Sequence, residues 1–219
     1  MNPEQSIILK VESVSIGYPG KVLQSELSFT LQKGEVVGLI GRNGKGKSTL
    51  LRTIAGLLPA LKGSIFLDGD DLTTMNNSQR AKRVSIVLTQ RFQLGGIDVR
   101  TLIQMGRYPY SGGFGLQSNE DYTVTETIMM QLGISELAAK PLSELSDGEQ
   151  QKVMIARALA QQTPLILMDE PTAFLDFVAK REIFQLLRQI ADEQKITILF
   201  SSHDLEMIRE FSDRSITLD

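Results

Sequence analysis

The sequence contains no cysteine, and this absence excludes a disulfide framework and any metal site built from thiolates. It also fits a reducing compartment. No apolar run approaches the roughly 20 residues that a transmembrane helix needs. The first five residues, Met-Asn-Pro-Glu-Gln, lack the basic segment and the apolar core of a signal peptide. We therefore expect a protein that is soluble by itself and reaches a membrane only through a partner.

The sequence also lacks an excess of positive charge. It has 23 lysine and arginine residues against 26 aspartate and glutamate residues, a net charge of -3. A nucleic-acid-binding protein usually carries a basic surface, so this balance predicts no nucleic-acid partner. The length of 219 residues and the hydrophobic content of 42% suit one α/β domain with a sizeable core, with or without a small insert.

A glycine-rich stretch at residues 41–49 fits the pattern G-x-x-x-x-G-K-[ST]. An apolar, β-prone run precedes it at 36–40, and a helix-like run follows at 50–55. In this context, glycines let the backbone bring the free N–H groups of a helix N-terminus onto phosphate oxygens. The candidates for nucleotide binding are Gly41, Arg42, Asn43, Gly44, Lys45, Gly46, Lys47, Ser48 and Thr49.

Two residues of this loop have chemical roles in the pattern. Lys47 would reach the β- and γ-phosphates of the nucleotide, and the Ser48 hydroxyl would bind Mg²⁺. The alternative is a glycine-rich turn with a coincidental lysine and serine, which the strand before it and the helix after it disfavour.

Two adjacent carboxylates, Asp169 and Glu170, follow an apolar run at residues 165–168. Such a run is typical of a parallel strand buried on both faces, and ligands gather at the carboxyl ends of such strands. Together with the phosphate loop, the pair predicts that Asp169 holds Mg²⁺, directly or through water. Glu170 would polarise the water that attacks the γ-phosphate. The alternative is a strand end where acidic residues meet solvent.

A second helix start with a glycine lies at residues 145–150, Leu-Ser-Asp-Gly-Glu-Gln. Ser146 and Glu149 have the spacing of a capping box, which by itself indicates ordinary capping. Gly148, however, is a poor residue for a first helical turn, unless the backbone must approach something closely. A helix N-terminus is an anion site, and this one has no lysine of its own. We therefore expect it to meet a nucleotide bound to a second copy of the chain.

Three single residues are weaker candidates. Gln90 follows a strand and could ligate Mg²⁺ and position water, although a glutamine is usually polar surface. His203, the only histidine, ends an apolar run and could donate a hydrogen bond to the γ-phosphate, although a lone histidine is more often a capped strand end or a satisfied polar group. Tyr18, on the turn after the first expected strand, could stack on adenine or simply lie over that strand.

These motifs, in this order, resemble the ATP-binding cassette (ABC) ATPases along nearly the whole chain. The matching segments are residues 41–49 (Walker A), Gln90 (Q-loop), 145–149 (the LSGGQ signature), 165–170 (Walker B), 173–176 (D-loop), Tyr18 (adenine stacking) and His203 (switch histidine). The departures are small: Asp147 and Glu149 replace the commoner Gly and Gln of the signature, and Lys45 stands where a small residue is usual. Relatives usually carry further strands and a helix after the position of Asp219.

The resemblance implies a head-to-tail homodimer that binds ATP and Mg²⁺ between its two chains. The implied catalytic residues are Glu170, His203, Lys47 and Gln90, and the implied metal ligands are Ser48, Gln90 and Asp169. The implied nucleotide contacts outside the Walker A loop are Tyr18, Ser146, Gly148, Glu149 and Asp176. ATP binding would close the dimer and hydrolysis would open it.

The sequence of residues 99–110 and the form Leu-Ser-Asp-Gly-Glu of the signature resemble ATPases of bacterial importers for iron-siderophore, haem or cobalamin. This implies a cytoplasmic subunit at the inner face of the plasma membrane. It would contact integral membrane permease subunits through residues 91–144, and indirectly serve a periplasmic or surface solute-binding protein. A soluble ABC-type ATPase acting on ribosomes or DNA is the alternative, and a small-molecule kinase would explain the glycine-rich loop alone.

The expected fold is an α/β P-loop core with a parallel sheet flanked by helices and an antiparallel β subdomain at the N-terminus. The core comprises residues 1–90 and 145–219, and a helical subdomain is inserted at 91–144. Within the β subdomain, we expect residues 6–16 to form an edge strand because their hydrophobic pattern partly alternates.

Overall fold

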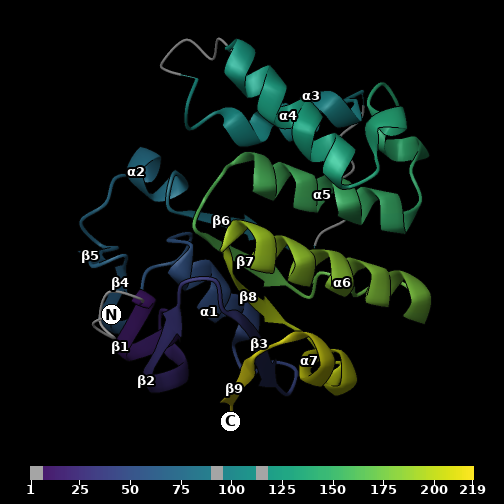
Figure 1. Cartoon of the computed structure of the whole chain (residues 1–219). Coiled ribbons are helices and arrows are strands. Elements are labelled where there is room, and N and C mark those ends of the chain that lie inside the picture. The colour runs from purple at the N-terminus through teal and green to yellow at the C-terminus, as the bar shows by residue number, and fades with distance from the viewer. Residues whose placement is uncertain (1–6, 90–95, 112–117) are drawn as a thin grey trace.

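The computed structural model describes residues 7–89, 96–111 and 118–219, which form two sheets and a set of helices (Figure 1). The antiparallel sheet has the order β2-β1-β4-β5 and the parallel sheet the order β6-β7-β8-β3-β9. The strands are β1 (Ile7–Tyr18), β2 (Lys21–Gln32), β3 (Val36–Gly41), β4 (Lys62–Leu67), β5 (Asp70–Asp71), β6 (Val84–Val87), β7 (Leu165–Asp169), β8 (Thr197–Ser201) and β9 (Arg214–Leu218). The expected fold class is confirmed.

The central strands of the parallel sheet are buried on both faces. Every residue of β7 and β8 is buried, as the wholly apolar runs predicted. Along β7, Ile166 and Met168 pack on one face with the helices that follow β6, while Leu165 and Leu167 pack on the other face with the helix that follows β3 and with the antiparallel sheet. The sheet is therefore the middle layer of the molecule, and its carboxyl edge lies between the two apolar clusters.

The first strand is central in its sheet, so the prediction of an edge strand is wrong. β1 pairs with β2 along the hairpin and with β4 on its other side, where Leu9 lies opposite Leu67 and Val11 opposite Ile65. Its residues Leu9, Val11 and Val14 are fully buried. The pairing with β4 joins residues that are far apart in the sequence, such as Leu9 and Leu67, and a local hydrophobic pattern carries no information about such a partner.

Helices cover both faces of the parallel sheet. The helical elements are α1 (Lys47–Ile54), α2 (Asn77–Ala81), α3 (Val99–Gln104), η2 (Met105–Arg107), α4 (Asn119–Gln131), η3 (Ser135–Leu137), η4 (Leu142–Glu144), α5 (Asp147–Ala160), α6 (Phe177–Gln194) and α7 (Leu205–Phe211). In the described parts of 91–144, the regular elements are all helical, as expected, apart from an isolated bridge between Asp98 and Pro141. Figure 1 shows α3 and α4 stacked over α5.

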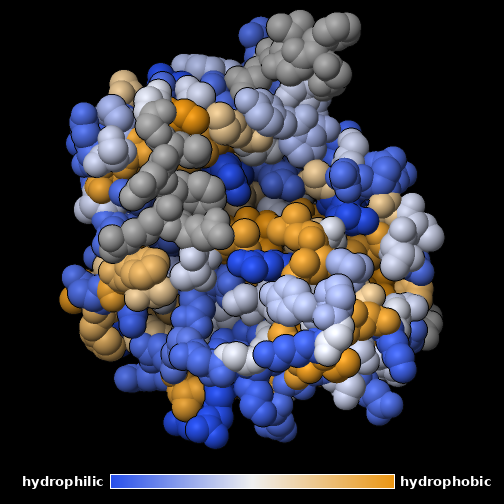
Figure 2. All heavy atoms as spheres, turned by 180° about the vertical axis from the view of Figure 1, so that it is seen from behind, coloured by the Kyte–Doolittle hydropathy of each residue, from blue (hydrophilic) through white to orange (hydrophobic). Residues whose placement is uncertain are grey.

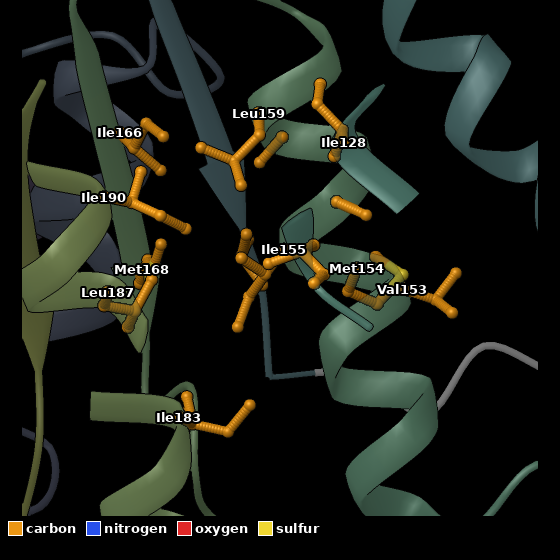
Figure 3. Packing of buried hydrophobic residues seen from close by; sticks show 14 of the residues in the cluster. Ile128, Val153, Met154, Ile155, Leu159, Ile166, Met168, Ile183, Leu187 and Ile190 are labelled. Carbon is orange, nitrogen blue, oxygen red and sulfur yellow. The ribbon is translucent and has the colours of Figure 1, made fainter. Parts of the chain in front are cut away.

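The helix α5 connects the parallel sheet to the helical group, which consists of the helical elements from α3 to η4. Ile155 and Leu159 point toward Ile166 and Met168 of β7, while Val153 lies on the opposite side of the helix (Figure 3). Both faces of α5 are therefore buried, one against the sheet and one against α3 and α4. Any movement of α5 must shift one of these two packed surfaces.

The outer surface is mixed in character. On the face seen in Figure 2, hydrophilic side chains predominate, and apolar atoms gather near the middle. No helix in the described part of the chain has the length and apolar composition needed to cross a bilayer.

Candidate active site

The glycine-rich loop joins the carboxyl end of β3 to the N-terminus of α1, as the motif predicts. Gly44 and Gly46 have φ angles of 80° and 97°, in the left-handed region that favours glycine. Lys47 is 6% exposed, and its Nζ donates to the Gly41 carbonyl oxygen at 2.7 Å. The loop thus curls around the lysine, and the first N–H groups of α1 face the space beside it, where an anion would bind.

A network of buried oxygens joins the loop to the acidic pair. The Ser48 and Ser201 hydroxyls both donate to Asp169 Oδ1, each at 2.9 Å. Ser201 Oγ in turn accepts the backbone N–H of Glu170 at 2.9 Å. Thr89 Oγ1, at the end of β6, donates to the backbone oxygen of Asp169. Three segments, the N-terminus of the helix after the loop, the end of β8 and the residues after β6, therefore converge on Asp169.

The carboxylate of Glu170 lies between the side-chain nitrogens of His203 and Lys47. His203 Nε2 lies 2.5 Å from Glu170 Oε1, and Lys47 Nζ lies 4.0 Å from the same oxygen. The backbone of Glu170 has a φ of 49°, a conformation that residues with a Cβ seldom adopt and that costs on the order of 1 kcal/mol. The hydrogen bond from its N–H to Ser201 holds this conformation and aims the carboxylate at the lysine and histidine.

The second helix start has the capping box that the spacing predicted. Ser146 Oγ accepts the N–H of Glu149 at 3.3 Å, and Glu149 Oε2 accepts both the N–H and the hydroxyl of Ser146 at 2.8 Å. The backbone and hydroxyl hydrogen bonds from Ser146 hold the pKa of Glu149 below its usual value. Both side chains are therefore occupied in fixing the first turn of α5.

Gly148 in this turn has no packing reason to be glycine. A Cβ placed there would meet only Leu175 Cδ2, at 4.0 Å. By contrast, a Cβ at Gly38 of β3 would lie 2.6 Å from Ile208 of α7, so that glycine is required by the close approach of a helix. The described residues therefore leave the space beside Gly148 open, so that a group from outside the chain can approach it.

The remaining candidates are spread over the molecule. Arg42 and Asn43 are exposed at the tip of the loop, and Lys45 is half-buried, with its carbonyl oxygen accepting from Gln24 at 3.1 Å. Asp176 caps α6 by accepting the N–H of Ala179 at 2.9 Å. Gln90 lies outside the described residues.

Tyr18 differs from its expected position. It is the last residue of β1 and pairs with Lys21 across the hairpin, rather than lying on the turn, which Pro19 and Gly20 form. The residue is 44% exposed, and its ring remains available for stacking. The strand extends further than expected because β2 pairs with it up to this residue.

Comparisons with known proteins agree with this arrangement. The sequence model of the ABC transporter family matches residues 24–173. The chain is an ATP-binding subunit of the ABC transporter family. It is 38% identical over 210 residues to the iron(3+)-hydroxamate import ATP-binding protein FhuC of Bacillus subtilis, which covers 96% of this chain and 78% of that protein.

Solved structures give the same family. The chain is similar to cbiO1 of Clostridium perfringens, part of the ABC transporter complex cbiONQ, with a TM-score of 0.85 and 28% identity over 98% of this chain and 85% of that one. It is also similar to a bacterial ABC transporter cassette solved as a dimer, with a TM-score of 0.84 and 26% identity over 96% and 94% of the two chains.

Besides Thr89, a second residue of this ABC ATPase site, Ser201, was not predicted from the sequence. It is fully buried and links Asp169 to the backbone of Glu170. A signal was present, because Ser201 ends an apolar strand and the carboxyl ends of parallel strands meet at one edge.

Proposed function

We propose that this chain is the ATP-hydrolysing subunit of a bacterial importer for an iron-siderophore, haem or cobalamin. The site network carries the ATPase part of the proposal: Lys47, Ser48, Asp169 and Glu170 converge at one edge of the sheet. The similarity to an iron(3+)-hydroxamate import protein supports the importer part. These three solutes are named because residues 99–110 and the signature resemble the ATPases of importers for them.

Each residue of the network has a distinct role in the proposed reaction. Lys47 leaves the Gly41 carbonyl to neutralise the β- and γ-phosphates of bound ATP. Glu170 accepts a proton from the attacking water, and His203 donates a hydrogen bond to the γ-phosphate. Gln90 is proposed to position that water, and Tyr18 to stack on adenine. These groups act by position and charge, as phosphoryl transfer requires.

The residues around Asp169 fit Mg²⁺. Its carboxylate and the Ser48 hydroxyl are oxygen ligands that converge within hydrogen-bonding distance, 2.9 Å. Mg²⁺ is typically held by one or two such ligands together with substrate phosphates. When bound, the ion would neutralise charge on the β- and γ-phosphates. Gln90 is proposed as a further ligand.

The open space at Gly148 supports a head-to-tail homodimer. In this arrangement Ser146, Gly148 and Glu149 of one copy close on the nucleotide held by residues 41–49 of the other, and Asp176 lies at the same interface. Residues 91–144 would contact the permease, which places the chain at the cytoplasmic face of the plasma membrane. No nucleic-acid partner is proposed.

The test of the proposed reaction uses two variants of the purified chain. Glu170→Gln should bind ATP as the wild type does but lower kcat by about 10²- to 10⁴-fold, because it removes the proton acceptor. Lys47→Ala should weaken ATP binding as well as turnover. Binding is measured by equilibrium titration and turnover by phosphate release. Wild-type rates in Glu170→Gln would refute the role of Glu170.

A further inference from the structure

The segment of residues 105–110 docks on the C-terminal turn of α5. Its sequence, Met-Gly-Arg-Tyr-Pro-Tyr, belongs to the stretch that resembles importer ATPases, but no role in the nucleotide site accounts for it. Gly106 is needed for the approach, because a Cβ there would lie 2.3 Å from the carbonyl oxygen of Arg157. The two backbones are therefore in direct contact.

Arg107 is the centre of this contact. It is 3% exposed, and its Nε donates to Asp121 Oδ1 of α4 at 2.7 Å. Its Nη1 donates to the carbonyl oxygen of Ala160 at 2.8 Å and to Gln162 Oε1 at 2.6 Å. One guanidinium group thus joins the N-terminus of α4 to the C-terminus of α5, where its charge also opposes the negative end of the helix dipole.

Tyr110 completes the attachment. Its ring lies over the guanidinium of Arg107, at 4.2 Å from the ring centroid, and its hydroxyl donates to the carbonyl oxygen of Gln161 at 3.0 Å. Carbonyl groups at the end of a helix have no intrahelical partner. Two of them, at Ala160 and Gln161, are satisfied here by side chains of the helical group.

The same turn of α5 is also attached to the core. The side-chain amide of Gln161 donates to the carbonyl oxygens of Ala81 and Val84, at 2.6 and 3.1 Å. The backbone of Gln161 is thus bound to the helical group, and its side chain is bound to the segment that leads into β6. A helix of 14 residues is about 21 Å long, so a small tilt at this end displaces the N-terminal end of α5 by a larger distance.

We propose that Arg107 is a positioning residue for ATP hydrolysis. By clamping the C-terminal turn of α5 to α4, it fixes the orientation in which Ser146 and Gly148, at the opposite end of α5, meet the nucleotide of the second copy. This inference rests on the proposed head-to-tail dimer. It assigns no contact between Arg107 and the nucleotide itself.

The test compares Arg107→Gln, Arg107→Lys and Gly106→Ala with a matched control, Arg100→Gln. Arg100 pairs with Glu126 at 2.8 Å and joins α3 to α4, but both side chains are about one-third exposed. ATP binding to the dilute monomer is measured by titration with a fluorescent ATP analogue, and kcat and KM by phosphate release. All assays are run at least 15 °C below the measured Tm of each variant.

We expect Arg107→Gln to bind the analogue within twofold of wild type, because residues 41–49 are intact, and to lose at least tenfold in kcat. Gly106→Ala should behave similarly because it forces the segment away from α5. Arg107→Lys retains the charge but cannot donate to all of these acceptors at once, so its kcat should lie between those of Arg107→Gln and the wild type. Arg100→Gln should match the wild type.

Three results would overturn the inference. They are wild-type kcat in folded Arg107→Gln, a parallel loss of binding and kcat, or the same loss in Arg100→Gln. If Arg107→Gln does not fold, Arg107→Lys and Gly106→Ala decide by the same criteria. A wild-type chain without ATPase activity would instead refute the proposed function, so the two failures are distinguishable.

Discussion

The backbone of Glu170 shows how one residue position is prepared for chemistry. Its φ of 49° places the carboxylate within 2.5 Å of His203 and 4.0 Å of Lys47, instead of continuing the direction of β7. A strained position persists only where the surroundings hold it. Here the holding group is the hydroxyl of Ser201, which binds the N–H of Glu170 and the carboxylate of Asp169 together.

Replacing Ser201 with alanine should therefore affect both stability and activity. The variant leaves the buried N–H of Glu170 without its acceptor, which should lower the free energy of unfolding by about 1–3 kcal/mol. Freed from this bond, Glu170 should lose its orientation, and kcat should fall more than ATP affinity. Urea unfolding and phosphate release measure the two effects. Ser143→Ala, at an exposed serine, should change neither by more than about 0.5 kcal/mol.

The helix N-termini show how far local patterns predict the site. The capping box of Ser146 and Glu149 was predicted from its spacing, and α4 begins with a similar reciprocal pair, Ser118 and Asp121. Local hydrogen bonds of this kind depend on residues three positions apart, so a sequence shows them. What the sequence does not show is that Asp121 also binds Arg107, because that contact depends on the packing of η2 between α4 and α5.

Asp121 should make the free energy of unfolding fall as the pH is lowered into the acidic range. Hydrogen bonds from the backbone and hydroxyl of Ser118 and from Arg107 hold its pKa below the ordinary value of 3.8. Because the folded state binds this proton less readily than the unfolded state, the carboxylate stabilises the fold above pH 4. This contribution is lost as the pH falls through 3.8 and below.

The corresponding variant is Asp121→Asn, which leaves Arg107 buried without its carboxylate. It should cost about 3 kcal/mol at pH 7, and its difference from wild type should shrink as the pH falls from 5 to 3. Urea unfolding across this range is the measurement, with Glu126→Gln on the same helix as the control. A gap that stays constant down to pH 3 would show that Asp121 does not titrate as described. Glu126→Gln, which removes the exposed pair with Arg100, should lower the free energy of unfolding by less than about 1 kcal/mol.

At the scale of the whole molecule, the sequence predicted the order of the elements and the edge of the sheet where the site lies. It did so because β3, β7 and β8 are largely apolar runs and each is followed by polar residues with a chemical role. It failed for β1, which is central because of β4, and for Tyr18, which lies in the hairpin because of β2. Both errors concern pairings with other segments, which local periodicity does not encode.

The open space at Gly148 leads to the last prediction, which concerns two molecules together. Among the described residues, a Cβ there would meet nothing closer than Leu175 Cδ2 at 4.0 Å, and acidic residues are favourable in the first turn of a helix. Gly148→Asp should therefore fold as stably as wild type but repel the phosphates of a nucleotide held by another copy. Ser143→Asp, at an exposed position nearby, controls for the added charge and should remain active.

Mixing Gly148→Asp with Lys47→Ala then tests the composite site. Each variant alone should be inactive, because both sites of its homodimer lack an essential group. In a mixed dimer, one site carries both defects, while the other combines an intact Lys47 loop with an intact Gly148 turn. An equal mixture should recover about a quarter of wild-type turnover if the sites act independently, since half the dimers are mixed and each has one intact site. Phosphate release measured over a range of mixing ratios gives the answer. Activity that stays at the level of the separate variants at every ratio, with mixed dimers detected by mass, would place Lys47 and Gly148 in the same copy's site and rule out the head-to-tail arrangement.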